Sequence, residues 1–131
     1  MVIDWTGEFQ NWLESLEAEV DAGDHVARRQ LKFAIAGMSR LNDLSEPPSE
    51  DSAVLMRVRQ RRKYPIWRVS HPFDDEVAVR LIVWFPEGET AGVIVAFGGD
   101  KKRVGDAFYT SAASRADAAI DQWLRERSRE T

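Results

Sequence analysis

The sequence contains no cysteine and only two histidines in 131 residues. The lack of thiols excludes a disulfide framework, a thiol nucleophile, an iron–sulfur cluster and a cysteine zinc site. His25 and His71 are too few for a multi-histidine metal centre. A chain without cysteine fits a reducing compartment, so we expect a cytoplasmic protein.

Long apolar runs are also missing. No uninterrupted stretch approaches the roughly 18 apolar residues that cross a bilayer. The N-terminal MVIDWTGEFQ lacks the basic stretch and apolar core of a signal peptide. We therefore expect a soluble protein with no membrane partner.

The chain has fewer basic than acidic residues, 18 against 22, and its net charge is −4. This balance argues against a nucleic-acid binder held by overall positive charge. The distribution is uneven, however: Met1–Asp24 contains seven acidic residues and no Lys or Arg, whereas Arg57–Arg68 contains six basic residues and no Asp or Glu. Such a split can attract a polyanion to one face. The alternative is two solvated surfaces that differ by chance.

The composition is typical of a single globular domain, which we expect to span residues 1–131. Hydrophobic residues make up 44% of the chain and include five Trp and six Phe. These large side chains can bury enough apolar area for a core without disulfides.

The N-terminal third predicts a helical hairpin. Thr6 can cap a helix from Thr6 to about Asp21, Gly23 suits the left-handed residue after it, and Asp24 can cap a second helix. The spacing of the apolar residues gives each helix one stripe. The stripes are Phe9, Trp12, Leu13, Leu16 and Val20, then Leu31, Ala34, Ile35, Met38 and Leu41.

After an irregular connection at Asn42–Ser52, the apolar period changes from 3.6 to 2, which is typical of strands. We expect four strands, in VLMRVRQR, IWRVS, VAVRLIVWF and GVIVAFG, followed by a terminal helix in one or two pieces from Asp106 onward. This order predicts an α+β fold. The hairpin and the C-terminal helix would pack on one face of a mainly antiparallel four-stranded sheet.

Alternation along these strands predicts an arginine-bearing face. If the helices cover the face with Met56, Val58, Trp67, Val69, Val79 and Leu81, then Arg57, Arg59, Arg68 and Arg80 lie on the other face. Guanidinium groups bind phosphates, and Ile82 and Trp84 on the same face could stack bases. The alternative is that these arginines shield an open sheet face and pair with nearby carboxylates.

A second candidate is the segment GGDKKRVGDAFY at Gly98–Tyr109, which carries three adjacent cations. It lacks the spacing of a phosphate-binding P-loop, so it gives little support to nucleotide hydrolysis. Such a basic run is often only a solvated loop, and a tyrosine in a helix often belongs to the core. Here we expect the loop to open at the edge of the arginine-bearing face.

These features resemble the RelE/HigB-type toxins of type II toxin–antitoxin systems, including their phage-derived HigB-like branch. The resemblance rests on the hairpin, IWRVS, the arginine in VRLIVWF, VIVAFGGDKKR and the C-terminal helix, and covers roughly Phe9 to Leu124. In that branch a strand ending in Phe is followed by a Lys-Lys pair, and the preceding strand carries an Arg. Phe97, Lys101, Lys102 and Arg80 occupy those places.

The resemblance implies a RelE/ParE-like fold and ribosome-dependent cleavage of mRNA without a metal ion or other cofactor. A base would activate the RNA 2′-hydroxyl while cations stabilise the reacting phosphate. It also implies mRNA, the ribosome and a cognate antitoxin, a small helix-turn-helix protein, as partners. The implied catalytic residues are Arg80, Lys101, Lys102 and Tyr109; the implied RNA-binding residues are Arg57, Arg59, Arg61, Arg62, Lys63, Arg68 and Arg103.

Two other functions stay open at this point. One is a non-catalytic ParE-like toxin that binds DNA gyrase through the same basic face. The other is a non-toxic phage or host accessory protein that uses Trp5 and the acidic first helix to bind a partner. His71, which precedes Pro72, is a candidate acid or base, although we favour a structural role in a turn; His25 is expected at the surface.

Overall fold

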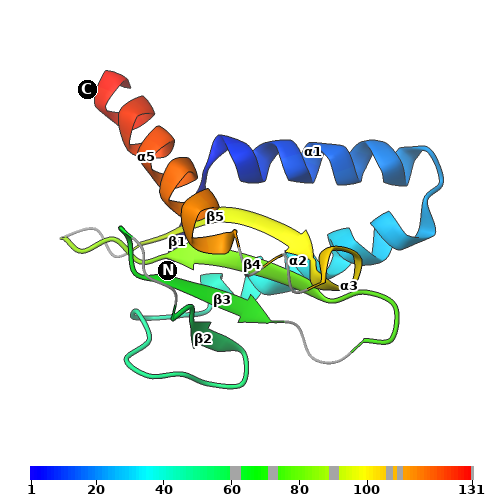
Figure 1. The fold of residues 1–131 in the computed structure, drawn as a ribbon, viewed down its shortest axis with the longest axis horizontal. Coiled ribbons are helices and arrows are strands. Elements are labelled where there is room, and N and C mark those ends of the chain that lie inside the picture. The colour runs from blue at the N-terminus through cyan, green and yellow to red at the C-terminus, as the bar shows by residue number, and fades with distance from the viewer. Residues whose placement is uncertain (60–62, 71–73, 89–91, 106–107, 109–110, 131) are drawn as a thin grey trace.

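The computed structural model describes residues 1–59, 63–70, 74–88, 92–105, 108 and 111–130 (Figure 1). Among the candidates above, Arg61, Arg62, His71 and Tyr109 lie outside the described residues. The elements are β1 (Val2–Trp5), α1 (Gly7–Asp21), α2 (His25–Asn42), β2 (Leu55–Arg57), β3 (Ile66–Ser70), β4 (Val79–Trp84), β5 (Gly92–Asp100), α3 (Lys101–Val104) and α5 (Ala112–Glu130).

The predicted helical hairpin and its caps are confirmed. The Thr6 hydroxyl accepts a hydrogen bond from the Phe9 amide at 3.2 Å, and the Asp24 carboxylate accepts one from the Ala27 amide at 3.0 Å. Gly23 has a φ of +91° between the helices, in the region that favours glycine.

The buried stripe of α2 differs from the prediction. Ile35 was expected in the core but is 57% exposed, whereas Phe33 is buried. Gly37 explains the rotation, because a Cβ at this position would lie 2.9 Å from Cδ1 of Leu81. The helix therefore approaches the sheet with its Phe33–Gly37 side.

The sheet has five strands in the order β1-β5-β4-β3-β2, so the prediction of four strands is wrong. β1 pairs in parallel with β5, and the other neighbours are antiparallel. The four residues of β1 show no regular alternation, and their partner strand begins only at Gly92. Nothing local in the sequence marks such a strand, because its hydrogen bonds come from a distant segment.

Helices cover both faces of the sheet, so the expectation that all of them share one face is also wrong. Leu81 packs in the core with Phe9 and Phe33 of the hairpin, whereas the next residue, Ile82, packs with Ala116 and Ile120 of α5. Successive strand residues point to opposite faces. Figure 1 accordingly shows α5 in front of the sheet and α2 behind it. We call these sides the hairpin face and the α5 face.

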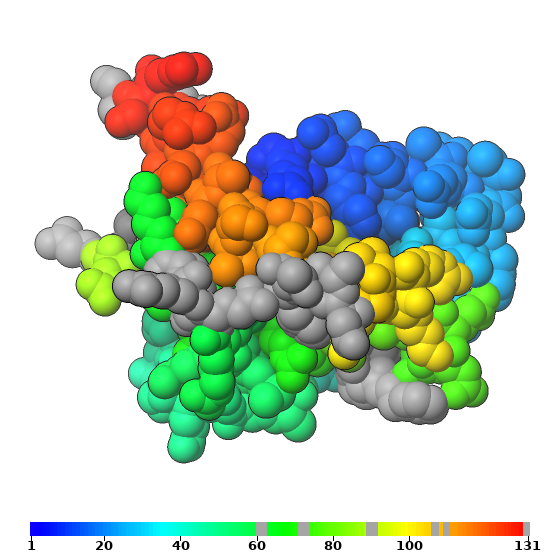
Figure 2. All heavy atoms as spheres, in the orientation of Figure 1, coloured from blue at the N-terminus to red at the C-terminus, as the bar shows by residue number. Residues whose placement is uncertain are grey.

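Polar contacts connect α5 to the start of α1 on one side and to the residues before β3 on the other. The Arg115 guanidinium contacts the Glu8 carboxylate at 2.6 Å, and Figure 2 shows α5 lying beside the first part of α1. On the other side, the Asp121 carboxylate accepts hydrogen bonds from Tyr64 and Lys63. These two donors, Tyr64 first, lower the pKa of Asp121, and the same contact raises the pKa of Tyr64.

None of the helices in the described part of the chain has both the length and the apolar character that crossing a membrane requires.

Candidate nucleic-acid interface

Arg68 and Arg80 lie together on the α5 face. Arg68 stands opposite Ile82, and Arg80 stands opposite Ser70. The two arginines are therefore diagonal neighbours on adjacent antiparallel strands, a relation that places such residues about 7–8 Å apart. This part of the predicted arginine face is confirmed.

Arg80 lies beside a glycine that makes room for a phenylalanine ring. Its other cross-strand partner is Gly99, above which lies Phe108: a Cβ at Gly99 would be 2.8 Å from Cε2 of Phe108. The Arg80 Nη1 donates to the Val79 carbonyl at 3.1 Å. Its Nε is buried and has no hydrogen-bond partner among the residues that the structure describes. A buried guanidinium N–H without an acceptor is costly, and an anion would satisfy it.

Arg68 is half-buried, and its Nη2 lies 3.1 Å from the sulfur of Met56. Met56 and Arg68 are cross-strand partners, so Met56 lies on the α5 face and not beneath the hairpin. The predicted phase of β2 is thus wrong by one residue.

This shift separates Arg57 and Arg59 from the other two arginines. Arg57 pairs with Trp67 on the hairpin face, and its guanidinium lies 5.1 Å from the centre of the Trp67 ring. Arg59 contacts the Asp51 carboxylate at 2.9 Å. The pKa of Asp51 is lowered by the Arg57 backbone amide and then by the Arg59 guanidinium. The prediction that four arginines share one face is therefore wrong for these two.

The surface that Ile82 and Trp84 were predicted to offer for base stacking is largely buried. Ile82 is fully buried under α5. Trp84 is half-buried, and its ring centre lies 5.0 Å from that of Tyr64. α5 packs over Ile82, so this part of the α5 face is covered.

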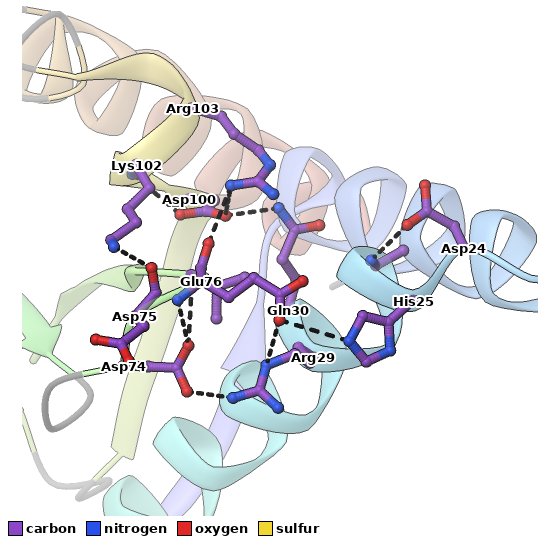
Figure 3. Close-up of polar contacts among 12 residues, drawn as sticks. Asp24, His25, Arg29, Gln30, Asp74, Asp75, Glu76, Asp100, Lys102 and Arg103 are labelled. Carbon is purple, nitrogen blue, oxygen red and sulfur yellow. Dashed lines mark hydrogen bonds and ion pairs between the residues drawn. The ribbon is translucent and has the colours of Figure 1, made fainter.

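The three cations after β5 do not act alike. Lys102 Nζ donates to the Asp75 carbonyl, and Arg103 Nη1 donates to the Glu76 carbonyl at 3.2 Å (Figure 3). Lys101 instead continues the ladder of β4 and β5, since its amide donates to the Ala78 carbonyl at 2.9 Å. Lys101 thus lies two residues after Gly99, the partner of Arg80, while Lys102 and Arg103 join α3 to residues 75 and 76.

Lys63 was a candidate RNA-binding residue from its sequence position. Its ammonium group lies 2.9 Å from the Asp121 carboxylate, and its amide donates to Asp117. The first contact raises the pKa of Lys63. In this structure Lys63 fastens α5 to the start of β3.

Sequence reasoning missed Asp100, whose side chain is 3% exposed. Its carboxylate accepts hydrogen bonds from the amides of Ala78 and Lys102 and from the Gln30 side chain. An aspartate directly before Lys-Lys is a helix-capping signal, but α3 spans only Lys101–Val104. A helix of one turn leaves no apolar period from which to recognise it.

The acidic segment at residues 74–76 is held in a similar way. The Asp74 carboxylate accepts hydrogen bonds from the Glu76 and Val77 amides and pairs with Arg29. The two amides first, and then Arg29, lower the pKa of Asp74 to about 2.

We expect Asp74→Asn to lower the melting temperature at pH 7 and to flatten its acid dependence. A carboxylate with a lowered folded pKa stabilises the fold above its ordinary value of 3.8, and loses that contribution as the pH falls toward about 2. Thermal unfolding of both proteins between pH 7 and pH 2 measures this. Curves that stay parallel over the whole range would contradict the assignment.

A pocket of about 320 Å³ lies elsewhere, lined by residues that include Asp4, Ile94, Trp123 and Arg127. It is at the opposite end of β5 from Gly99, so it is separate from the two arginines. In the described residues, no group of three or more His, Cys, Asp or Glu side chains is placed to hold a metal ion.

Comparison of the chain with models of protein families, with curated proteins and with solved structures gave no match in any of the three.

Proposed function

We propose that the protein is the toxin of a type II toxin–antitoxin system and cleaves mRNA on the ribosome. The observation that carries the proposal is the pair Arg68 and Arg80 on one sheet face, with the Nε of Arg80 buried and lacking an acceptor among the described residues. The succession of hairpin, antiparallel strands and C-terminal helix, on which the family resemblance depends, supports it.

In the proposed reaction, the RNA 2′-oxygen attacks the adjacent phosphorus while the bond from phosphorus to the 5′-oxygen breaks. The 2′-hydroxyl proton passes to a base, and the leaving oxygen receives a proton. The products are a 2′,3′-cyclic phosphate and a 5′-hydroxyl. Arg80 would stabilise the charge that builds up on the phosphate oxygens, because a guanidinium donates to two of them at once.

Arg68 would hold a neighbouring phosphate, since it lies one diagonal step from Arg80. Lys101 would complete the cationic edge as an RNA ligand or as the group that moves a proton, and Tyr109 remains a proposed partner in proton transfer or base stacking. Lys102 and Arg103 donate to backbone carbonyls, so in this proposal they support the site from behind. A cognate antitoxin would neutralise the protein by covering the cationic edge.

Induced expression in a bacterial host tests the proposal. Growth arrest together with new mRNA 5′ ends at codon-related positions is the expected result. Arrest without new ends, accompanied by altered DNA topology, would replace this function by gyrase binding. Normal growth at a verified protein level would favour a non-toxic accessory protein.

A further inference from the structure

A buried carboxylate lies directly behind the proposed site. Asp100 is the one charged residue that is buried among those the structure describes. Burying a charge is unfavourable unless the charge is fully hydrogen-bonded. The hydrogen-bond partners of Asp100 therefore indicate which segments this carboxylate holds in place.

Both carboxylate oxygens are occupied, and they reach three different segments (Figure 3). Oδ1 accepts from the Ala78 amide at 2.8 Å and from the Lys102 amide at 3.0 Å. Oδ2 accepts from Nε2 of Gln30 at 2.8 Å and lies 3.3 Å from Nη1 of Arg103. Asp100 thus joins the residue before β4, the first turn of α3 and the second turn of α2.

The segments joined in this way are those that carry the proposed site. Ala78 precedes Arg80 by two residues, and its carbonyl accepts from the Lys101 amide at 2.9 Å. The Asp100 side chain and this backbone bond together fix how Lys101 stands relative to Arg80. Without Asp100, only one hydrogen bond among those described would link Ala78 to the start of α3.

We propose that Asp100 is a positioning residue that holds the backbone of Lys101 against the strand that carries Arg80, and that Gln30 fixes this arrangement to α2. The inference rests on the proposed function for its effect on RNA, but its structural part stands separately. A displacement of about 1 Å at a reacting group can lower a rate by about 100-fold. Asp100 would act in this way without touching the RNA.

The test compares Asp100→Ala, Asp100→Asn and Gln30→Leu with the wild type, in cleavage of a defined mRNA on purified programmed ribosomes. We expect Asp100→Ala to lower kcat by about 100-fold while KM changes less than about 3-fold. Asn at position 100 still accepts the two backbone amides, and Gln30 can turn its amide to match, so Asp100→Asn should restore most of the rate. Gln30→Leu, which keeps both backbone contacts, should lower kcat by about 10-fold.

Glu17→Ala provides the matched control, because Glu17 is an exposed acid on α1, and its kcat should equal that of the wild type. Hydrogen exchange at the Ala78 and Lys102 amides is measured in parallel. Faster exchange in Asp100→Ala, with Gln30→Leu still folded, is the expected result.

Three outcomes have distinct meanings. Full kcat in Asp100→Ala, or equal loss in Asp100→Ala and Asp100→Asn, would overturn the positioning role. If Asp100→Ala does not fold, unchanged kcat in folded Gln30→Leu overturns the connection to α2, and a loss of about 100-fold in folded Asp100→Asn overturns the role of Asp100. If the wild type cuts no RNA, the proposed function fails, and unchanged exchange at Ala78 and Lys102 would then separately reject the structural part.

Discussion

Replacing Arg80 with glutamine is expected to lower the rate of mRNA cleavage by about 100- to 1000-fold, the usual effect of removing one charge-stabilising donor from an active site. Glutamine keeps a polar side chain of reduced length, but it carries no positive charge. The half-buried Arg80 forms no ion pair among the described residues, so the variant should fold normally. Single-turnover cleavage on programmed ribosomes measures the loss.

Arg57→Gln is the matched control for this experiment. Arg57 is a strand arginine from the same basic segment, but it lies on the hairpin face over Trp67. Its replacement should change the cleavage rate by less than about 3-fold. Equal losses in the two variants would mean that total charge matters and that the α5 face has no special role.

Phe97 lies in the core between the sheet and α5. We expect Phe97→Ala to lower the free energy of unfolding by about 3–5 kcal/mol. Phe97 is 0% exposed, its ring centre lies 5.7 Å from that of Phe108, and the Arg115 guanidinium lies 4.1 Å from the ring. The truncation therefore leaves a cavity between the sheet and α5 and removes support from Arg115.

Against a total stability of about 5–15 kcal/mol, such a loss is large. It corresponds to a fall of about 10–20 °C in melting temperature for a chain of this size. Leu124→Ala on α5 is the control, because Leu124 is 38% exposed and its truncation should change the free energy of unfolding by less than about 1 kcal/mol. A melting temperature for Phe97→Ala within about 3 °C of the wild type would show that α5 is not packed as described.

The features that the sequence predicts correctly are those encoded by neighbouring residues. The caps Thr6 and Asp24 and the turn at Gly23 depend on contacts within a few positions of the chain. The alternation in β3 and β4 likewise assigned Arg68 and Arg80 to one face. Local chemistry is sufficient for such elements.

The incorrect predictions concern features whose structure depends on contacts with residues far away in the sequence. β1 depends on pairing with β5, and the phase of the short β2 depends on its register with β3, which puts Arg57 opposite Trp67. The position of α5 follows from small residues such as Ala112 and Ala116, whose buried side faces Ile82 and Phe97. An alanine-rich helix has an apolar side that fits either face of a sheet, so its sequence does not reveal which one it covers.

In the candidate site, too, the features that the sequence does not predict depend on contacts between distant residues. Asp100 connects Ala78, Gln30 and Lys102, and no spacing in the sequence indicates that these residues meet. For the same reason the sequence predicted Lys102 as catalytic and Arg103 as RNA-binding, although both side chains donate to the backbone of residues 75 and 76.

The chemistry of the RNA ends that the purified protein makes on programmed ribosomes distinguishes attack by the 2′-oxygen from any other route of cleavage. Attack by the 2′-oxygen predicts new fragments with a 5′-hydroxyl, which join to an adaptor only after enzymatic phosphorylation, and upstream fragments with a 2′,3′-cyclic phosphate. These ends should form about 100- to 1000-fold more slowly with Arg80→Gln and at nearly the wild-type rate with Arg57→Gln. New ends bearing a 5′-phosphate, or intact mRNA with folded wild-type protein, would rule out this reaction.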